Sequence, residues 1–171
     1  MQLTPITEIE RDLILEWRNH PETRTSMFSQ RVISQKEHEQ WFEHLQDDQS
    51  SHWFIAKETD QTPMGVVYFT DINEYHETSF WGFYTKPTAS AGTGTRMLFS
   101  ALDYAFGPLG LRKVCAEALE TNAASLRLHE KCGFVREGIF REQYRSGDKT
   151  LNIIRFGLLA SEWAGSSNNH H

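Results

Sequence analysis

The chain has 171 residues, of which 39% are hydrophobic and 23% are charged. This length and balance suit one folded domain with its own core, and they exclude disordered, collagen-like and low-complexity proteins. The formal net charge of −6 argues against a general nucleic-acid-binding surface. No apolar run is long enough to span a membrane, and the N-terminus lacks a signal-peptide pattern. We therefore expect a cytoplasmic protein without nucleic-acid or membrane partners.

The first fifty residues are predicted to form a short strand and two helices. Residues 3–6 suit an opening strand. Thr7 and Glu10 are spaced as a capping box, so a helix should begin there and end before Pro21. Ser34 begins a second helix with a box of the same type.

The middle of the chain changes to the two-residue period of strands. Residues 53–57 and 64–72 are predicted to form a hairpin, and residues 78–85 form a third strand. The small-residue segment 88–95 then leads directly into an amphipathic helix that ends near Gly107.

The remaining residues are predicted to complete a sheet. Residues 112–119 form a strand, and the helix over residues 122–131 is ended by Gly133 in a left-handed conformation. The strands 135–145 and 149–159 follow. The order indicates an α/β fold with a mixed, mostly antiparallel sheet and flanking helices. We expect one domain over residues 1–163, and a disordered tail or cloning remnant over residues 164–171.

Two segments carry chemistry. Ala91-Gly92-Thr93-Gly94-Thr95 lies between a strand and a helix, where free amide groups suit a phosphate or pyrophosphate, although a flexible loop would have the same composition. It lacks the lysine of a Walker loop and the third glycine of a dinucleotide-binding loop. The second segment is a helix with the pattern N-x-x-S from Asn122 that ends in E-K-C-G-F at residue 134.

Together these segments resemble the GCN5-related N-acetyltransferase (GNAT) family. The resemblance continues through Gly138, Phe140 and Tyr144, and near the start through Trp17-Arg18-Asn19 and Trp41-Phe42. It extends over nearly the whole chain. It is strongest toward the branch of ribosomal-protein alanine acetyltransferases and the UDP-4-amino-sugar acetyltransferases of pseudaminic acid synthesis. The resemblance implies the GNAT fold of acyl-CoA N-acyltransferases.

The family implies acetyl-CoA as co-substrate, with no metal. By position, the backbone of the third strand should pair with the pantetheine arm, the loop amides should hold the pyrophosphate, and the start of the last helix should contact the pantetheine or the amine. These cofactor-binding residues are Phe83, Tyr84 and Thr85; Gly92, Thr93, Gly94, Thr95 and Arg96; and Asn122 and Ser125.

The chain departs from the family pattern at three positions. Ala89 replaces the Gln or Arg that begins many phosphate loops, and Phe80 replaces a glutamate two residues before the strand glycine. His129 replaces the tyrosine that protonates the departing thiolate. A histidine can donate that proton, so His129 is the candidate acid, although a structural role on the helix is an equal alternative. Glu117 is the candidate base, with Glu77 and Glu120 as unranked alternatives that would act through water.

The acceptor is expected to be a small-molecule amine or a protein N-terminus. Trp17, Arg18 and Arg24 are the candidate acceptor-binding residues, since arginines bind the diphosphate of a nucleotide sugar, although a solvated surface would also carry them. We therefore expect an N-acetyltransferase acting on a UDP-linked 4-amino-4,6-dideoxy sugar. An N-terminal alanine acetyltransferase of a ribosomal protein and a non-catalytic acyl-CoA-binding module are the alternatives. A homodimer is left open.

Overall fold

The computed structural model describes residues 1–167, which fall into two compact units. The first unit contains residues 1–72 and 82–101, and the second contains residues 73–81 and the chain from Leu102 onward. Strand β4 (Thr78–Thr85) and helix α4 (Thr93–Phe106) each contribute residues to both units. The prediction of one domain over residues 1–163 stays a prediction.

The first unit is built on an antiparallel set of strands. Strand β1 (Gln2–Pro5) pairs with β2 (His52–Lys57), and β2 pairs with β3 (Pro63–Asn73). The second half of β4 follows β3 in the strand order. The buried residues of β2 and β3 alternate only weakly because both faces of these strands are covered.

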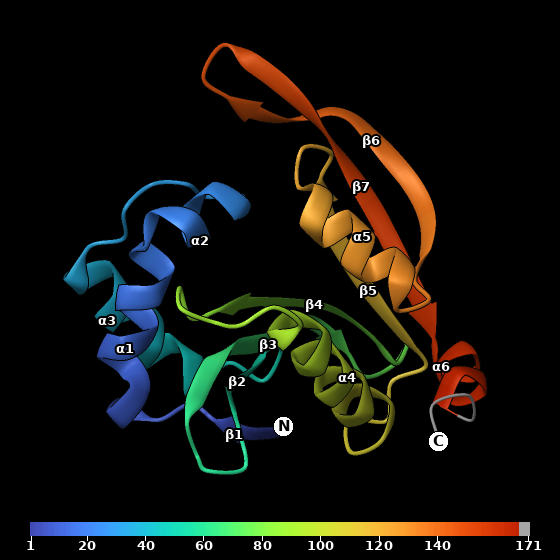
Figure 1. The fold of residues 1–171 in the computed structure, drawn as a ribbon, viewed down its shortest axis with the longest axis horizontal. Coiled ribbons are helices and arrows are strands. Elements are labelled where there is room, and N and C mark those ends of the chain that lie inside the picture. The colour runs from blue at the N-terminus through green and yellow to red at the C-terminus, as the bar shows by residue number, and fades with distance from the viewer. Residues whose placement is uncertain (168–171) are drawn as a thin grey trace. The chain divides into compact units, whose positions relative to one another are not determined.

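Three helices precede β2 in this unit: α1 (Glu8–Asn19), α2 (Pro21–Ser26) and α3 (Gln35–Leu45). Both predicted capping boxes are present, at Thr7 and at Ser34. Figure 1 shows these helices together at the blue end of the chain. The apolar face of α1 lies in a core cluster formed by Ile14, Trp17, Ile55, Val66 and Tyr84.

The second unit contains the other strands. The first half of β4 pairs in parallel with β5 (Lys113–Leu119), and β5 pairs antiparallel with β7 (Lys149–Leu159). Strand β6 (Val135–Ser146) pairs antiparallel with β7 and forms the long hairpin in orange and red in Figure 1. Helix α5 (Ala123–Lys131) precedes β6, and α6 (Ala160–Ser167) follows β7.

The hydrogen-bonded strand order over the chain is β1-β2-β3-β4-β5-β7-β6. The expected α/β fold with a mostly antiparallel sheet is therefore confirmed. Gly133 has the predicted left-handed conformation, with φ of +89°.

Two helices were absent from the predictions. Pro21 was interpreted only as the end of α1, but it also occupies the first turn of α2, where its missing amide proton leaves no bond unmade. Helix α6 is begun by the Glu162 carboxylate, which accepts from the Leu159 amide at 2.9 Å. This helix extends into the segment expected to be a tail, and residues 168–171 lie outside the described residues. Between residues 1 and 167, no helix is long and apolar enough to cross a membrane.

Candidate active site

The first turn of α4 presents the predicted phosphate-binding amides. Gly92 has a φ of +84°, a conformation that favours glycine, and turns the chain into the helix. The Thr93 amide donates to Ser90 O at 3.2 Å, and the Arg96 amide donates to Gly92 O at 3.1 Å. The amides of Gly94 and Thr95 belong to the first helical turn, where no intrahelical acceptor precedes them. This geometry suits a pyrophosphate at the helix N-terminus.

The Arg96 side chain turns back toward the same helix end. Its Nη2 donates to Glu58 Oε1 at 2.8 Å and to Thr93 Oγ1 at 3.3 Å. A Cβ added at Gly92 would lie 3.8 Å from Arg96 Nη1, so the guanidinium stands beside the loop. Ala89 supplies no polar side chain there. The Arg96 guanidinium, paired with Glu58, is thus a positive charge beside this helix start, and it would suit a phosphate there.

Replacing Arg96 with alanine is expected to raise the KM for acetyl-CoA about tenfold, because one charge-assisted hydrogen bond is worth about 1.5 kcal/mol. The kcat should stay within about twofold, since the phosphates are remote from the reacting carbonyl. Initial-rate kinetics at varied acetyl-CoA would measure both. Arg127→Ala, an exposed arginine on α5, is the matched control. An unchanged KM in Arg96→Ala would contradict this role.

The second half of β4 holds the three residues expected to pair with pantetheine. The parallel ladder with β5 includes Thr78 to Phe80 and so ends before Phe83. On the β3 side, the Lys86 amide donates to Met64 O at 2.8 Å, which continues the contact between β3 and the chain that leaves β4. The Tyr84 side chain is buried in the core cluster, so its expected contribution to cofactor binding is limited to its backbone.

His129 is buried on α5, with 3% of its surface exposed. Its Nε2 accepts a hydrogen bond from Trp81 Nε1 at 3.2 Å, and its Nδ1 lies 2.8 Å from Ser125 O. The ring stacks on Phe156 with centroids 5.2 Å apart. An indole N–H can only donate, so Nε2 carries a lone pair and the ring proton is on Nδ1, donated to Ser125 O.

These contacts bear directly on the acid predicted from sequence. Burial lowers the pKa of His129, although the Ser125 carbonyl opposes this by raising it. The neutral ring donates its one N–H proton to the Ser125 carbonyl, and its other nitrogen accepts from the Trp81 indole. This geometry favours the structural alternative for His129, a residue that ties α5 to the Trp81 side chain.

Buried neutral histidines make the fold sensitive to mild acid. Burial also lowers the pKa of His38, which contacts Arg11 O through Nε2 at 2.7 Å. The unfolded chain binds protons at these positions near pH 6.5, and the folded chain does so only at lower pH. The free energy of unfolding should therefore fall as the pH drops from 6.5 to 5, by up to about 1.4 kcal/mol per pH unit for each histidine. Chemical denaturation at several pH values measures this slope, which should be shallower in His129→Gln.

The candidate base Glu117 is held in an ion pair. Arg155, its cross-strand partner on β7, donates to Glu117 Oε1 from Nε at 2.8 Å and from Nη2 at 2.6 Å. The Arg155 guanidinium also stacks over Phe80, 4.4 Å from the ring centroid. Phe80 stands where many family members carry a glutamate, so here the position provides an aromatic face for a cation. The Glu120 carboxylate also has a partner: its Oε1 accepts a hydrogen bond from the Asn152 backbone amide at 2.7 Å.

Asn122 and Ser125, the predicted cofactor-binding residues of the second unit, form the N-terminal cap of α5. The Asn122 side chain accepts from the Ser125 amide at 3.1 Å and is the N-cap of the helix. The Ser125 hydroxyl lies 3.4 Å from His129 Nδ1. Their contact with the cofactor stays a prediction.

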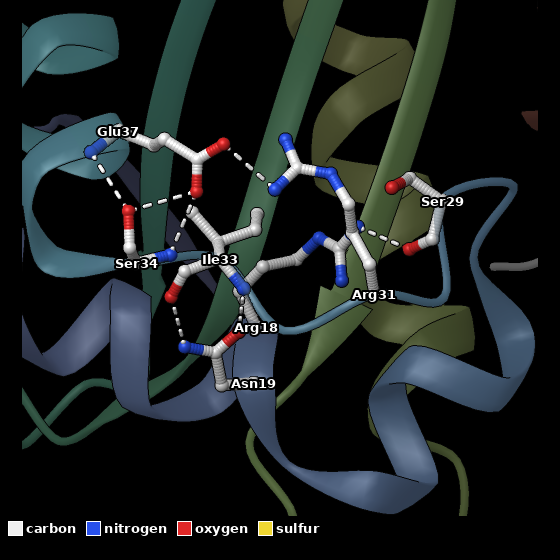
Figure 2. A network of polar contacts seen from close by, with 7 residues as sticks. All are labelled: Arg18, Asn19, Ser29, Arg31, Ile33, Ser34 and Glu37. Atoms are coloured by element: carbon white, nitrogen blue, oxygen red, sulfur yellow. Dashed lines mark hydrogen bonds and ion pairs between the residues drawn. The ribbon is translucent and has the colours of Figure 1, made fainter.

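Two of the three predicted acceptor-binding residues, Arg18 and Arg24, bind the segment between α2 and α3, and Figure 2 shows the polar network around Arg18. Arg18 Nη2 donates to Ser29 O at 2.7 Å, and Arg24 Nη1 donates to Gln30 O at 3.1 Å. Asn19 pairs through both of its amide atoms with the backbone of Ile33, at 2.8 Å each. We call residues 27–33 the anchored loop, since these side chains bind its main chain.

Arg18 is the residue of this group that retains binding capacity. Its Nη1 is buried and has no hydrogen-bond partner within the described part of the chain. Burial lowers the pKa of Arg18, and the charges of Arg24 and Arg31 lower it further. By contrast, Arg31 is neutralised by Glu37 at 2.7 Å. Trp17, the third predicted residue, is 6% exposed and packs in the core cluster.

Two functional candidates escaped the sequence interpretation. Tyr68 on β3 lies near Arg18, whose positive charge lowers the pKa of its hydroxyl against the larger effect of burial. Arg155 on β7 holds the Glu117 carboxylate in an ion pair. Neither residue belongs to a motif: Tyr68 is placed opposite Trp53 on β2 in the first unit, and Arg155 opposite Glu117 on β5 in the second. A register prediction for β5 and β7 would have found Arg155.

No group of three or more His, Cys, Asp or Glu side chains that could hold a metal occurs in the described residues. The helix start after β4 has the geometry expected of a pyrophosphate site, as in a transferase that uses an acyl-CoA. Residues 1–135 match the family model described as acetyltransferase (GNAT) domain. The chain belongs to the GNAT family and is an acetyl-CoA-dependent N-acetyltransferase.

Named relatives agree with this family but differ in acceptor. The chain is 26% identical to spermidine N(1)-acetyltransferase from Vibrio cholerae over 121 residues, which is 70% of each protein. It is 28% identical to acetyltransferase PseH from Campylobacter jejuni over 131 residues, 77% of this chain and 80% of PseH. The crystal structure of the Vibrio cholerae spermidine enzyme with CoA and spermine has a TM-score of 0.88. That alignment includes 95% of this chain and 97% of the enzyme at 23% identity, and it shows the shared fold.

Proposed function

We propose that the enzyme transfers the acetyl group of acetyl-CoA to the 4-amino group of a UDP-linked 4-amino-4,6-dideoxy sugar, as in pathways of the pseudaminic acid type. The observation that carries this proposal is the buried, unpartnered Nη1 of Arg18. Arg18 is half-buried, and a buried guanidinium nitrogen without a partner is costly, so a ligand that brings negative charge to it would remove that cost.

The positive charge around Arg18 distinguishes between a polyamine and a nucleotide sugar as the acceptor. The charge of Arg24 lowers the pKa of Arg18, and both side chains bind main-chain carbonyls, which bring no full negative charge. A polyamine would add further positive charge beside them, whereas a nucleotide diphosphate would be attracted. The similarity to PseH supports the same acceptor class.

Transfer is proposed to be direct. The amine nitrogen attacks the thioester carbonyl carbon, the C–S bond breaks, and its electron pair stays on the sulfur. The nitrogen loses one proton and the sulfur gains one, so the products are the amide and the free thiol of CoA. This route needs a neutral amine and a proton donor near the sulfur.

The test is the release of CoA thiol from acetyl-CoA with three acceptors in parallel: the UDP-linked 4-amino sugar, spermidine, and a peptide with an N-terminal alanine. Turnover on the sugar, with competitive inhibition by UDP, is the expected result. Turnover on spermidine alone would overturn the assignment in favour of a polyamine. Turnover on the peptide alone would instead indicate the protein-modifying branch.

A further inference from the structure

The side chain of Tyr68 is fixed by an aromatic stack in the first unit. Its ring lies on Trp53 with centroids 4.3 Å apart and an interplanar angle of 19°. Trp53 in turn meets the edge of Trp41 at 4.9 Å. Contacts of this kind contribute beyond simple burial and restrict the ring to one orientation.

The hydroxyl end of this ring lies against β4 at Gly82. A Cβ added at Gly82 would overlap the Tyr68 Cζ, Cε2 and hydroxyl oxygen. Glycine is therefore needed at this point of the strand because the phenol occupies the volume of a side chain. The Tyr68 hydroxyl is held directly over the β4 backbone, one residue before Phe83.

The position of Gly82 along β4 predicts that it lies beside the thioester of bound acetyl-CoA. This step rests on the proposed function. The pyrophosphate end of the cofactor belongs at the start of α4, after the C-terminal end of β4. Pantetheine paired with Thr85, Tyr84 and Phe83 then runs toward the N-terminal end of the strand. Its sulfur and acetyl group would come next, which is beside Gly82.

We propose that Tyr68 is a catalytic residue of the acetyl transfer, and that its hydroxyl protonates the departing CoA sulfur. As the C–S bond breaks, the Tyr68 O–H proton passes to the sulfur. The phenolate then takes a proton from the nitrogen that has become the amide nitrogen. Tyr68 is unchanged at the end, and one proton has moved from nitrogen to sulfur.

The surroundings of Tyr68 suit this role. Burial raises the pKa of its phenol, so the group is protonated at neutral pH and ready to donate. The Arg18 guanidinium acts in the opposite direction and would stabilise the transient phenolate. Tyr84, a second phenol near Arg18, has its pKa raised by burial and by Tyr68 against the same lowering effect of Arg18, but its ring is buried in the core cluster.

His129 offers no equivalent donor, since its one ring proton is bound to Ser125 O and its other nitrogen accepts from Trp81. The proton donor that the family takes from the position of His129 is thus supplied here from β3. Variants at the two positions give opposite expectations.

The test compares Tyr68→Phe with His129→Gln in the full chain. Phenylalanine keeps the stack on Trp53 and removes only the hydroxyl, so kcat should fall about 100-fold while the KM for acetyl-CoA stays within about twofold. Glutamine can still accept from Trp81 and donate to Ser125, so His129→Gln should keep kcat within about fivefold. Tyr75→Phe, an exposed tyrosine, is the matched control. Thermal unfolding of each variant identifies any loss of folding.

The proposal would be overturned if Tyr68→Phe folds and keeps the wild-type kcat. It would also be overturned if His129→Gln folds and loses kcat 100-fold while Tyr68→Phe stays active. Gly82→Ala is a second variant, which keeps the hydroxyl but displaces the ring, and it should lower kcat in the same way. The comparison uses whichever amine the wild type acetylates. If none is acetylated, the proposed acceptor fails, and hydrolysis of acetyl-CoA, which needs the same proton at sulfur, provides the readout for Tyr68.

Discussion

Replacing Arg18 with methionine is expected to raise the KM for a UDP-linked 4-amino sugar about 30-fold. The substitution removes the guanidinium whose Nη1 is buried without a partner. A charge-assisted hydrogen bond to a phosphate is worth about 2 kcal/mol, which corresponds to this factor. Methionine retains most of the length and the apolar stem of the side chain, so the packing against its neighbours is largely kept.

The stability of the same variant separates binding from folding. The bond to Ser29 O is lost, but so is a buried nitrogen without a hydrogen-bond partner, and these effects oppose one another. We therefore expect a change in Tm of less than about 3 °C. Arg11→Met on the same helix is the control and should leave the KM unchanged. Equal loss of activity toward an uncharged amine would contradict an anion-binding role for Arg18.

Replacing Gly65 with alanine is expected to destabilise the protein by about 3 kcal/mol. A Cβ at this position of β3 would lie 2.5 Å from the Tyr84 carbonyl oxygen and 2.6 Å from the Met97 Cε. Met97 could move its flexible end, but the carbonyl belongs to the backbone of β4, where the strand must shift to relieve the overlap. Such overpacking in a core is costly because the surroundings are already dense.

The measurement is thermal unfolding, in which a loss of about 3 kcal/mol lowers the Tm by roughly 6–12 °C for a chain of this size. Gly138→Ala in β6 is the matched control, because a Cβ there would meet no atom within 4 Å. A Tm for Gly65→Ala equal to that of the control would show that β3 and β4 separate easily at this point.

The elements that could be predicted from sequence are those set by local chemistry. The capping boxes at Thr7 and Ser34 and the left-handed Gly133 depend on residues close in sequence, and all three are confirmed. Helix α2 was missed because six residues give too few turns for a hydrophobic period to be visible. The same proline that ends one helix begins the next.

The site was predictable only where a motif carries it. The loop before α4 was found from its glycines, and the structure gives it the geometry of an anion site. The state of His129 was not predictable, because it depends on Trp81, which is distant in sequence. Glu117 likewise looked like a free base until β7 placed Arg155 opposite it. Pairing between strands determines which carboxylates have an ion-pair partner, and no local sequence pattern predicts that pairing.

The anchored loop suggests how acceptor preference could diverge within this fold. Arg18, Arg24 and Asn19 bind the main chain at Ser29, Gln30 and Ile33, so the hold on the loop does not depend on which side chains occupy those positions. The identity of residues 29 and 30 can therefore change without loosening the loop. At the proposed acceptor site, mutation at these two positions would change the surface while the main-chain contacts stay, and a library randomised there would test whether selectivity changes.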